Sequence, residues 1–298
     1  MLPLAACRPV NTLEGTPQTT LAEATEGARE PIELSPPTPS AFTGDVAMRH
    51  IRFLSEELGP RPAGSDVLEQ GCDYVLEALQ AAGYDNARKI RYELPNGKIL
   101  ANITATRAGR SDEEIVLAAH LDTVPDSPGA NDDASGVAAI LELAEILADV
   151  EPPRSVRFAV FKSEETLQGY DVHGFGSLQF IEDLEPEAIE KIRAACWLDK
   201  IGAGPALKVM HIEDTPAGLA KHLQTLARRR GLQPKLIAAK RWSEEMAFED
   251  RGIPAAWIEY SPAPQLHQPE DDITNVEQEK LAAIGALVHD WILEEPAP

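Results

Sequence analysis

The sequence is poor in cysteine, in basic residues and in long apolar runs. Its three cysteines, at positions 7, 72 and 196, are too few for the disulfide framework of a small secreted fold. No stretch approaches the roughly 20 consecutive apolar residues that a membrane-spanning helix needs. A formal net charge of −22 argues against nucleic acid or an anionic membrane surface as a partner, because both require basic patches. We therefore predict neither a nucleic-acid partner nor a membrane-spanning segment.

The composition that remains is that of a globular protein. Hydrophobic residues make up 43% of the 298 residues and charged residues 26%, which is ordinary for a folded chain. A chain of this length can bury one large core or two small ones. Cys72 falls on the face of a predicted helix and Cys196 in an apolar strand, so we expect both to be core thiols.

The first 43 residues differ from the rest. Residues 4–7, Leu-Ala-Ala-Cys, resemble the lipobox of bacterial lipoproteins, although the preceding signal regions are too short. Residues 8–41 are rich in Pro, Thr, Ser and Glu without apolar periodicity, which is linker composition. We therefore predict a truncated signal and flexible tether over residues 1–43 and a domain over residues 44–298. Cys7 is a candidate lipid anchor, and we expect an extracytoplasmic protein, secreted or lipid-anchored to a bacterial cell surface; the alternative is a chance match of four residues.

Strands and helices alternate along residues 44–298, without an internal repeat. Helices are predicted over residues 45–58, 66–83, 134–150, 177–183, 186–193, 216–230 and 276–293, and strands over residues 88–94, 99–106, 114–119, 155–162, 194–198, 207–212 and 255–259. Pro95-Asn96-Gly97, between the first two strands, is a hairpin signal. The alternation predicts a three-layer α/β/α domain with a central mixed, mostly parallel sheet.

The most informative stretch runs from residue 118 to residue 143, where a buried strand, an irregular loop and a helix follow one another. In open α/β sheets, ligands bind at the carboxyl ends of the strands. His120, Asp122, Asp132 and Asp133 all lie at that edge. An imidazole and several carboxylates suit a divalent metal, and zinc accepts both ligand types.

Ionisable residues follow other predicted strands in the same way. Glu164 and Glu165 follow the strand 155–162, Asp199 follows 194–198, and a short loop separates His267 from the last strand. A pair of metal ions that share one carboxylate needs about five protein ligands. Five residues fit that role: His120, Asp132, Glu165, Asp199 and His267. Glu164 is then left to move a proton.

Simpler interpretations of these residues stay open. A His-x-Asp pair is often a core contact, and Asn-Asp-Asp can be an ordinary helix cap. Single members of the set can also be exposed loop residues of an acidic protein. The placement of all these residues at successive strand ends favours a metal site.

With these residues in place, the sequence resembles the secreted co-catalytic di-zinc aminopeptidases, relatives of aminopeptidase Y, glutamate carboxypeptidase and glutaminyl cyclase. The resemblance covers residues 45–293, and the GANDDASG segment at residues 129–136 is its most specific part. The other matching pieces are GPRPAGS from Gly59, FKSEE from Phe161, WLDKIG from Trp197, GIPAAWI from Gly252 and HQPEDDITNV from His267.

The resemblance implies a role for each residue. His120, Asp132 and Asp199 would hold one zinc ion, and Asp132, Glu165 and His267 the other, with other divalent metals as alternatives. Glu164 would be the general base and later the acid, and Asp122 would orient the ring of His120. The resemblance also implies a cis peptide bond between Asp132 and Asp133. The implied activity is that of an aminopeptidase acting on peptides or small aminoacyl substrates.

Three departures from the family pattern concern the substrate. Leu266 stands where relatives often carry Tyr, and Ser243-Glu244-Glu245 replaces a frequent Ser-Asp-His segment. The loop after Glu165, which contains Tyr170 and His173, is longer than in the shortest family members. The alternatives are a related glutaminyl cyclase or carboxypeptidase, or a binding domain of the same fold without catalysis. The five ligands with Glu164 argue against a domain without catalysis. They also favour hydrolysis over cyclisation, since cyclases usually hold a single zinc ion with fewer ligands.

Overall fold

The computed structural model describes residues 42–94, 97, 99–165, 174–241 and 244–294. The chain divides into two compact units, residues 1–35 and 36–298, and all described residues belong to the second. The predictions for the tether, Cys7, Tyr170, His173 and Ser243 lie outside the described residues. Among the described helices, none is both long and apolar enough to cross a membrane.

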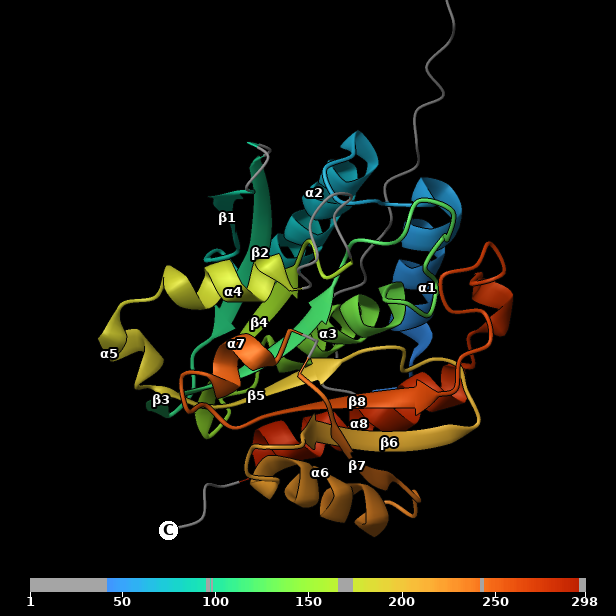
Figure 1. Ribbon diagram of the computed structural model, residues 1–298. Coiled ribbons are helices and arrows are strands. Elements are labelled where there is room, and N and C mark those ends of the chain that lie inside the picture. Colours follow the sequence, from blue (N-terminus) through green and yellow to red (C-terminus); the bar gives the residue numbers. More distant parts are fainter. Residues whose placement is uncertain (1–41, 95–96, 98, 166–173, 242–243, 295–298) are drawn as a thin grey trace, which may run out of the picture. The chain divides into compact units, whose positions relative to one another are not determined.

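The described strands form one mixed sheet in the order β1-β2-β4-β3-β5-β8-β6-β7 (Figure 1). The neighbours β4, β3, β5 and β8 run parallel to one another, whereas β2 and β6 run antiparallel to the strands beside them in this block. The four parallel strands therefore end at one common edge. The strands are β1 (Arg88–Glu93), β2 (Ile99–Arg107), β3 (Ser111–His120), β4 (Arg154–Phe161), β5 (Ile192–Leu198), β6 (Ala206–Ile212), β7 (Lys235–Ala239) and β8 (Ala255–Ser261).

Helices cover both faces of this sheet. One apolar cluster joins the sheet to α1 (Asp45–Arg52), α2 (Asp66–Ala81), α3 (Ala134–Leu147), α6 (Gly218–Arg229) and α8 (Gln278–Leu293). A second joins the opposite face to α4 (Phe175–Glu182), α5 (Pro186–Ile189) and α7 (Met246–Glu249). On β3, Leu117 belongs to the first cluster and Val116 to the second, as the alternation of a strand requires. The three-layer α/β/α prediction is confirmed.

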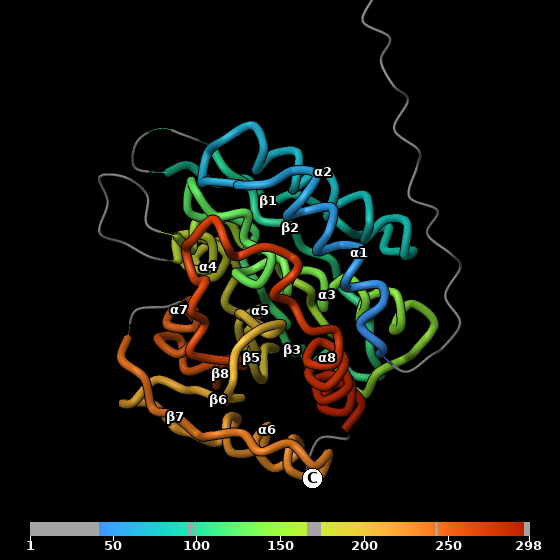
Figure 2. Tube along the Cα trace, turned by 90° about the vertical axis from the view of Figure 1, so that its right-hand side faces the viewer, coloured from blue at the N-terminus to red at the C-terminus, as the bar shows by residue number. Residues whose placement is uncertain are grey.

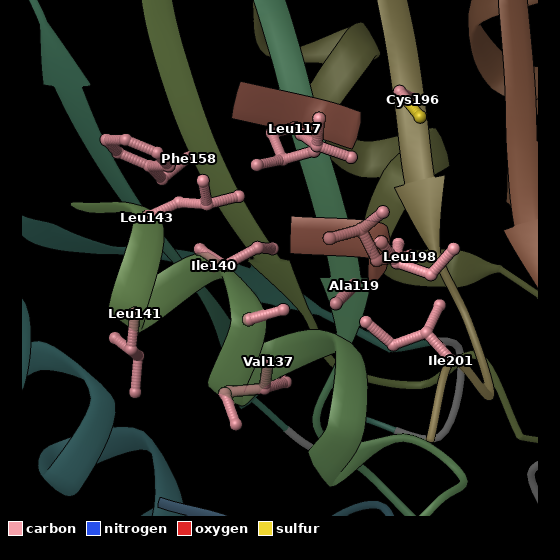
Figure 3. Close-up of a cluster of buried hydrophobic side chains, with 14 of the residues drawn as sticks. Leu117, Ala119, Val137, Ile140, Leu141, Leu143, Phe158, Cys196, Leu198 and Ile201 are labelled. Atoms are coloured by element: carbon pink, nitrogen blue, oxygen red, sulfur yellow. The ribbon is translucent and has the colours of Figure 1, made fainter. Parts of the chain in front are cut away.

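Helix α3 is the centre of the larger core. Figure 3 shows Val137 and Ile140 of α3 in one apolar cluster with Leu117 and Ala119 of β3 and Leu198 of β5. Helix α8 packs on both α3 and α6, and all three helices can be followed in Figure 2. A β-carbon added to Gly136 would lie 2.0 Å from the carbonyl oxygen of Leu198, so the first turn of α3 needs glycine to approach β5.

Most predicted elements are present, with three differences. The first predicted helix changes after Arg52 into a π-helical segment, Phe53–Leu58. Helix α5 is only one turn long, and Ile192 and Arg193, predicted as helix, belong to β5. The short edge strand β7, the one-turn helix α7 and the 3₁₀ turn Ile273–Asn275 carry no strong apolar period and were not predicted.

Several local predictions are confirmed. The predicted β1–β2 hairpin forms. At the start of α2 the hydroxyl of Ser65 accepts from the backbone N–H of Leu68 at 3.1 Å and so caps the helix. Cys72 and Cys196 are buried free thiols, and burial raises the pKa of both.

Candidate metal centre

The candidate ligands meet at the common edge of the parallel strands. His120 is the last residue of β3 and Asp199 directly follows β5; the loop after β4 carries Glu165 and the loop after β8 carries His267. Asp132 comes from the loop between β3 and α3. The structure brings all five together.

Asp132 lies between the two histidines. Its Oδ1 is 3.3 Å from Nε2 of His120, and its Oδ2 is 3.3 Å from Nε2 of His267. Glu165 adds Oε1 at 2.9 Å from Nε2 of His267, whereas Asp199 adds Oδ1 at 4.0 Å from Nε2 of His120. Each oxygen of Asp132 therefore faces a different imidazole, with a further carboxylate on either side.

Asp133 also lies close enough to complete a ligand set with His120 and Asp199. Its carboxylate is engaged elsewhere, because Oδ1 accepts from the backbone N–H groups of Gly136 at 2.9 Å and Lys200 at 3.3 Å. Asp133 is the N-cap of α3. The cap interpretation from the sequence thus describes Asp133, and the peptide bond between Asp132 and Asp133 is cis, as the family resemblance implied.

The donor set fits a divalent cation. Burial and the charge of Asp132 raise the pKa of Asp199, and burial with the neighbouring carboxylates raises that of Glu164 to about 8. Hydrogen bonds to Asp132 and Glu165 raise the pKa of His267 to about 10. Without a cation, protons on these groups offset the gathered negative charge. Metal ions can replace such protons, and imidazole with carboxylate oxygen is a donor set that zinc accepts.

A buried oxygen of Asp199 supports the same fit. Its Oδ1 has no hydrogen-bond partner among the described residues, although it is shielded from solvent. A buried polar atom without a partner is costly. A metal ion between Asp199 and His120 would satisfy it.

Asp122 organises the loop after β4 as well as His120. Its carboxylate accepts from the backbone N–H groups of Ser163 at 2.8 Å, Glu164 at 3.1 Å and Glu165 at 3.0 Å. The Nδ1 of His120 lies 3.1 Å from the carbonyl oxygen of Asp122 and 3.8 Å from its carboxylate. The backbone carbonyl is therefore the nearer partner of the ring, and the carboxylate mainly positions the two glutamates.

Two further supporting residues were not identified from the sequence. The carboxylate of Asp271 accepts from the backbone N–H groups of Asn131 at 2.9 Å and Asp132 at 3.0 Å. Arg61 is fully buried, and burial lowers its pKa to about 10. Its guanidinium donates to the carbonyl oxygens of Leu54, Gly59, Leu121, Pro128 and Gly129. Both residues fix the loop that carries Asp132, and both fall within segments that resemble the family.

The centre opens into a cleft of about 350 Å³. Three residues beside it have positive φ angles that non-glycine residues rarely adopt: Ser163 at 77°, Lys200 at 53° and His267 at 61°. Such backbone conformations cluster at functional sites. The residues that line the cleft are Asp132, Glu164, Glu165, Asp199, Lys200, Met210, Trp257, Glu259, Leu266 and His267.

Glu244 and Glu245, which stand where relatives often carry Asp-His, are buried at 1% and 0% exposure. Glu244 accepts from the indole N–H of Trp197 at 3.2 Å. Neither residue lines the described cleft.

Comparison with known proteins places the chain in a family. The model of peptidase family M28 matches residues 102–292. The aminopeptidase YwaD of Bacillus subtilis is 28% identical over 190 residues, which cover 60% of this chain and 40% of that protein. The chain thus spans less than half the length of this relative.

Solved structures agree on the fold. A zinc aminopeptidase from Bacillus subtilis superposes with a TM-score of 0.77 at 17% identity, over 86% of this chain and 97% of that one. A glutaminyl cyclase from Bacteroides thetaiotaomicron superposes with a TM-score of 0.75 at 21% identity, over 86% and 99%. The family match extends over more than half of the chain, from β2 into α8, and the chain therefore belongs to peptidase family M28.

Proposed function

We propose that the chain is an aminopeptidase that binds two divalent metal ions, zinc by preference, and hydrolyses the N-terminal peptide bond of its substrate. The observation that carries this proposal is the placement of Asp132, with one oxygen 3.3 Å from each of two histidines. His120, Asp132 and Asp199 would hold one ion, and Asp132, Glu165 and His267 the other. Bound there, the two ions would supply Lewis acidity to the scissile carbonyl group and to the attacking water.

Glu164 is the proposed proton carrier. It lines the cleft next to Glu165, and Asp122 positions its backbone. Burial raises the pKa of its carboxyl group to about 8, and nearby cations would bring that value down, because they stabilise the carboxylate. A carboxylate with a pKa near neutrality can take a proton from water and return it to the leaving amine.

The charges that line the cleft favour a substrate with a free amino group. A carboxypeptidase needs a cation for the terminal carboxylate. Lys200 is paired with Asp199, while Lys162 is buried and donates to Glu69 at 2.5 Å. Glu164 and Glu259 also line the cleft, and carboxylate oxygens can accept from an ammonium group; Glu259 shares its carboxylate with Lys208 and Ser261.

Apolar residues shape the remaining wall of the cleft. Met210 and Trp257 are cross-strand neighbours on β6 and β8, and Leu266 lies beside His267. Such a wall suits an apolar side chain on the N-terminal residue of the substrate.

A substrate panel tests the assignment. We expect the zinc-loaded protein to release chromogenic amines from aminoacyl amides and to leave the N-acetylated forms of the same amides intact. Equal cleavage of both forms would contradict the aminopeptidase proposal. Cyclisation of an N-terminal glutamine without peptide cleavage would favour the cyclase alternative, and metal binding without any turnover would favour a binding domain.

The N-terminal cysteine gives a separate proposal on location. We propose that Cys7 carries a lipid and that residues 8–41 tether the domain to a cell surface outside the cytoplasm, on the basis of the Leu-Ala-Ala-Cys segment and the linker composition after it. Mass spectrometry of the N-terminal peptide from the native organism should find a diacylglycerol-modified Cys7 at the N-terminus. An unmodified peptide that runs from residue 1 through Cys7 would contradict it.

A further inference from the structure

Lys200, one of the residues that line the cleft, has an unusual backbone conformation. Its φ of 53° lies in the left-handed region, which disfavours lysine. The conformation is fixed on both sides, because its N–H donates to Asp133 at 3.3 Å and its carbonyl accepts from the N–H of Tyr260 at 3.0 Å. The N-cap of α3 and the end of β8 therefore hold this residue, which lines the cleft.

The ammonium group of Lys200 is held between two carboxylates. It forms an ion pair with Oδ2 of Asp199 and lies 3.9 Å from Oε2 of Glu259. Glu259 is anchored in turn by Lys208 at 3.3 Å and by the hydroxyl of Ser261 at 2.6 Å. Only 15% of the Lys200 side chain is exposed, so solvent screens its charge incompletely.

The two oxygens of Asp199 consequently differ. Oδ1 faces His120 and has no hydrogen-bond partner among the described residues, whereas Oδ2 is engaged by Lys200. An ammonium group on one oxygen withdraws electron density from the carboxylate and repels a cation at the other. The ion pair also stabilises the metal-free protein. Whatever part of this stabilisation is lost when a metal ion binds weakens metal binding by the same free energy.

Among the described residues, no such cation contacts the carboxylates of the other candidate position, although the charge of Lys200 also acts on the shared Asp132. In the part of the chain that the structure describes, Asp132 and Glu165 form ion pairs with histidines and with no lysine or arginine. Supporting residues around a ligand usually change metal affinity by about 10–100-fold. In most metal sites the supporting partner is anionic or neutral, and here it is a cation.

We propose that Lys200 makes the two metal positions unequal by weakening the one that Asp199 completes. This inference rests on the proposed two-metal centre and concerns the order in which it fills. The position of Glu165 and His267 binds metal first, and the position of His120 and Asp199 fills only at a higher metal concentration. The occupancy of the position of His120 and Asp199 then depends on the concentration of available metal. Lys200 sets the concentration at which this position fills.

The test is a metal titration of the purified apoprotein by calorimetry, with zinc or cobalt in the presence of a competing chelator. We expect two sites of different affinity in the unmodified protein. Lys200→Met should tighten the weaker site by about 10–100-fold and leave the stronger site within about threefold. Lys200→Arg should keep the separation, because it keeps the charge.

Two further variants protect the result against folding effects. Lys200→Asn removes the charge with a residue that tolerates positive φ, so it should tighten the weaker site even if the methionine variant is unstable. Lys208→Met removes the same charge from the other side of Glu259, away from Asp199, and should move neither affinity by more than about threefold.

The outcomes separate this inference from the proposed function. Two sites of equal affinity in the unmodified protein, or a Lys200→Met variant whose weaker site is unchanged or weaker still, would overturn the role of Lys200 and leave the two-metal centre intact. A stoichiometry of one under saturating zinc would overturn both. An equal effect from Lys208→Met would show that general charge, and not contact with Asp199, sets the affinity.

Discussion

At the scale of single residues, the chemistry of this chain depends on which atoms of each carboxylate are already engaged. Asp122, Asp133 and Asp271 accept backbone N–H groups and thereby shape loops. Asp132 differs, because both of its oxygens face imidazoles. Sequence spacing distinguishes these aspartates poorly, since all are acidic loop residues, and only the hydrogen bonds separate a ligand from a support.

Asp132→Asn should remove most of both metal ions. An amide is a weaker ligand than a carboxylate and cannot bridge two cations as a charged group, so both positions lose affinity. Metal analysis after dialysis should fall from about two ions per chain in the unmodified protein to well below one, as expected for a shared ligand. The control is Asp126→Asn, an exposed carboxylate in the same loop. Loss of a single ion would mean that Asp132 serves only one position.

Glu164→Gln should separate metal binding from catalysis. The glutamine keeps the shape of the side chain and cannot accept the proton from water, so kcat should fall by about 10²–10⁴-fold with metal content unchanged. Glu165→Gln, one residue further along, should instead lower the metal content. Near-normal turnover of Glu164→Gln, measured on the same aminoacyl amide, would remove Glu164 from the mechanism.

The sequence predicted that the candidate ligands lie together because parallel strands end at one edge. His120, Glu165 and Asp199 each follow an apolar run, and that pattern needs no knowledge of side-chain packing. Arg61 and Asp271 escaped prediction for the opposite reason. They act through hydrogen bonds to backbone atoms of a loop far away in sequence, and no local periodicity reports such contacts.

At the scale of elements, the contact between α3 and β5 positions the centre, because it fixes the loop of Asp132 relative to the strand end of Asp199. Apolar periodicity predicted both elements, since each is buried along most of its length. It missed β7 and α7, because β7 is an edge strand with a mixed burial pattern and α7 has a single turn. Weakly buried and very short elements leave little periodic signal.

Gly136→Ala should disturb that contact. The added β-carbon would lie 2.0 Å from the carbonyl oxygen of Leu198 and 2.6 Å from the carboxylate of Asp133, so the helix start must move away from β5. We expect the free energy of unfolding to fall by about 1–3 kcal/mol or more, measured by urea denaturation. Gly218→Ala, at the first position of α6, is the matched control. A β-carbon added there would meet no atom within 4 Å beyond its chain neighbours and its own helix turn, so the change should be neutral or slightly stabilising.

At the scale of the whole molecule, the described domain begins with a short anchored segment before α1. The ring of Phe42 is 5% exposed and packs on Gly285 of α8, where an added β-carbon would lie 2.3 Å from it. Backbone N–H groups of Thr43 and Gly44 donate to Glu142 of α3 at 2.9 and 3.0 Å. Residues 42–44 therefore belong to the folded core, although the sequence assigned residues 42 and 43 to the tether.

A chain that starts at Phe42 should therefore keep the thermal midpoint and the metal content of the full chain, if residues 1–41 act as the proposed tether. Phe42→Ala in the full chain should lower the free energy of unfolding by about 3 kcal/mol or more, because it empties a buried contact between the N-terminal segment and α8. Thermal unfolding of both proteins, with the unmodified chain as reference, makes the comparison. A large drop in midpoint on removal of residues 1–41 would assign them to the domain, whereas a stable Phe42→Ala variant would place the start of the domain at α1.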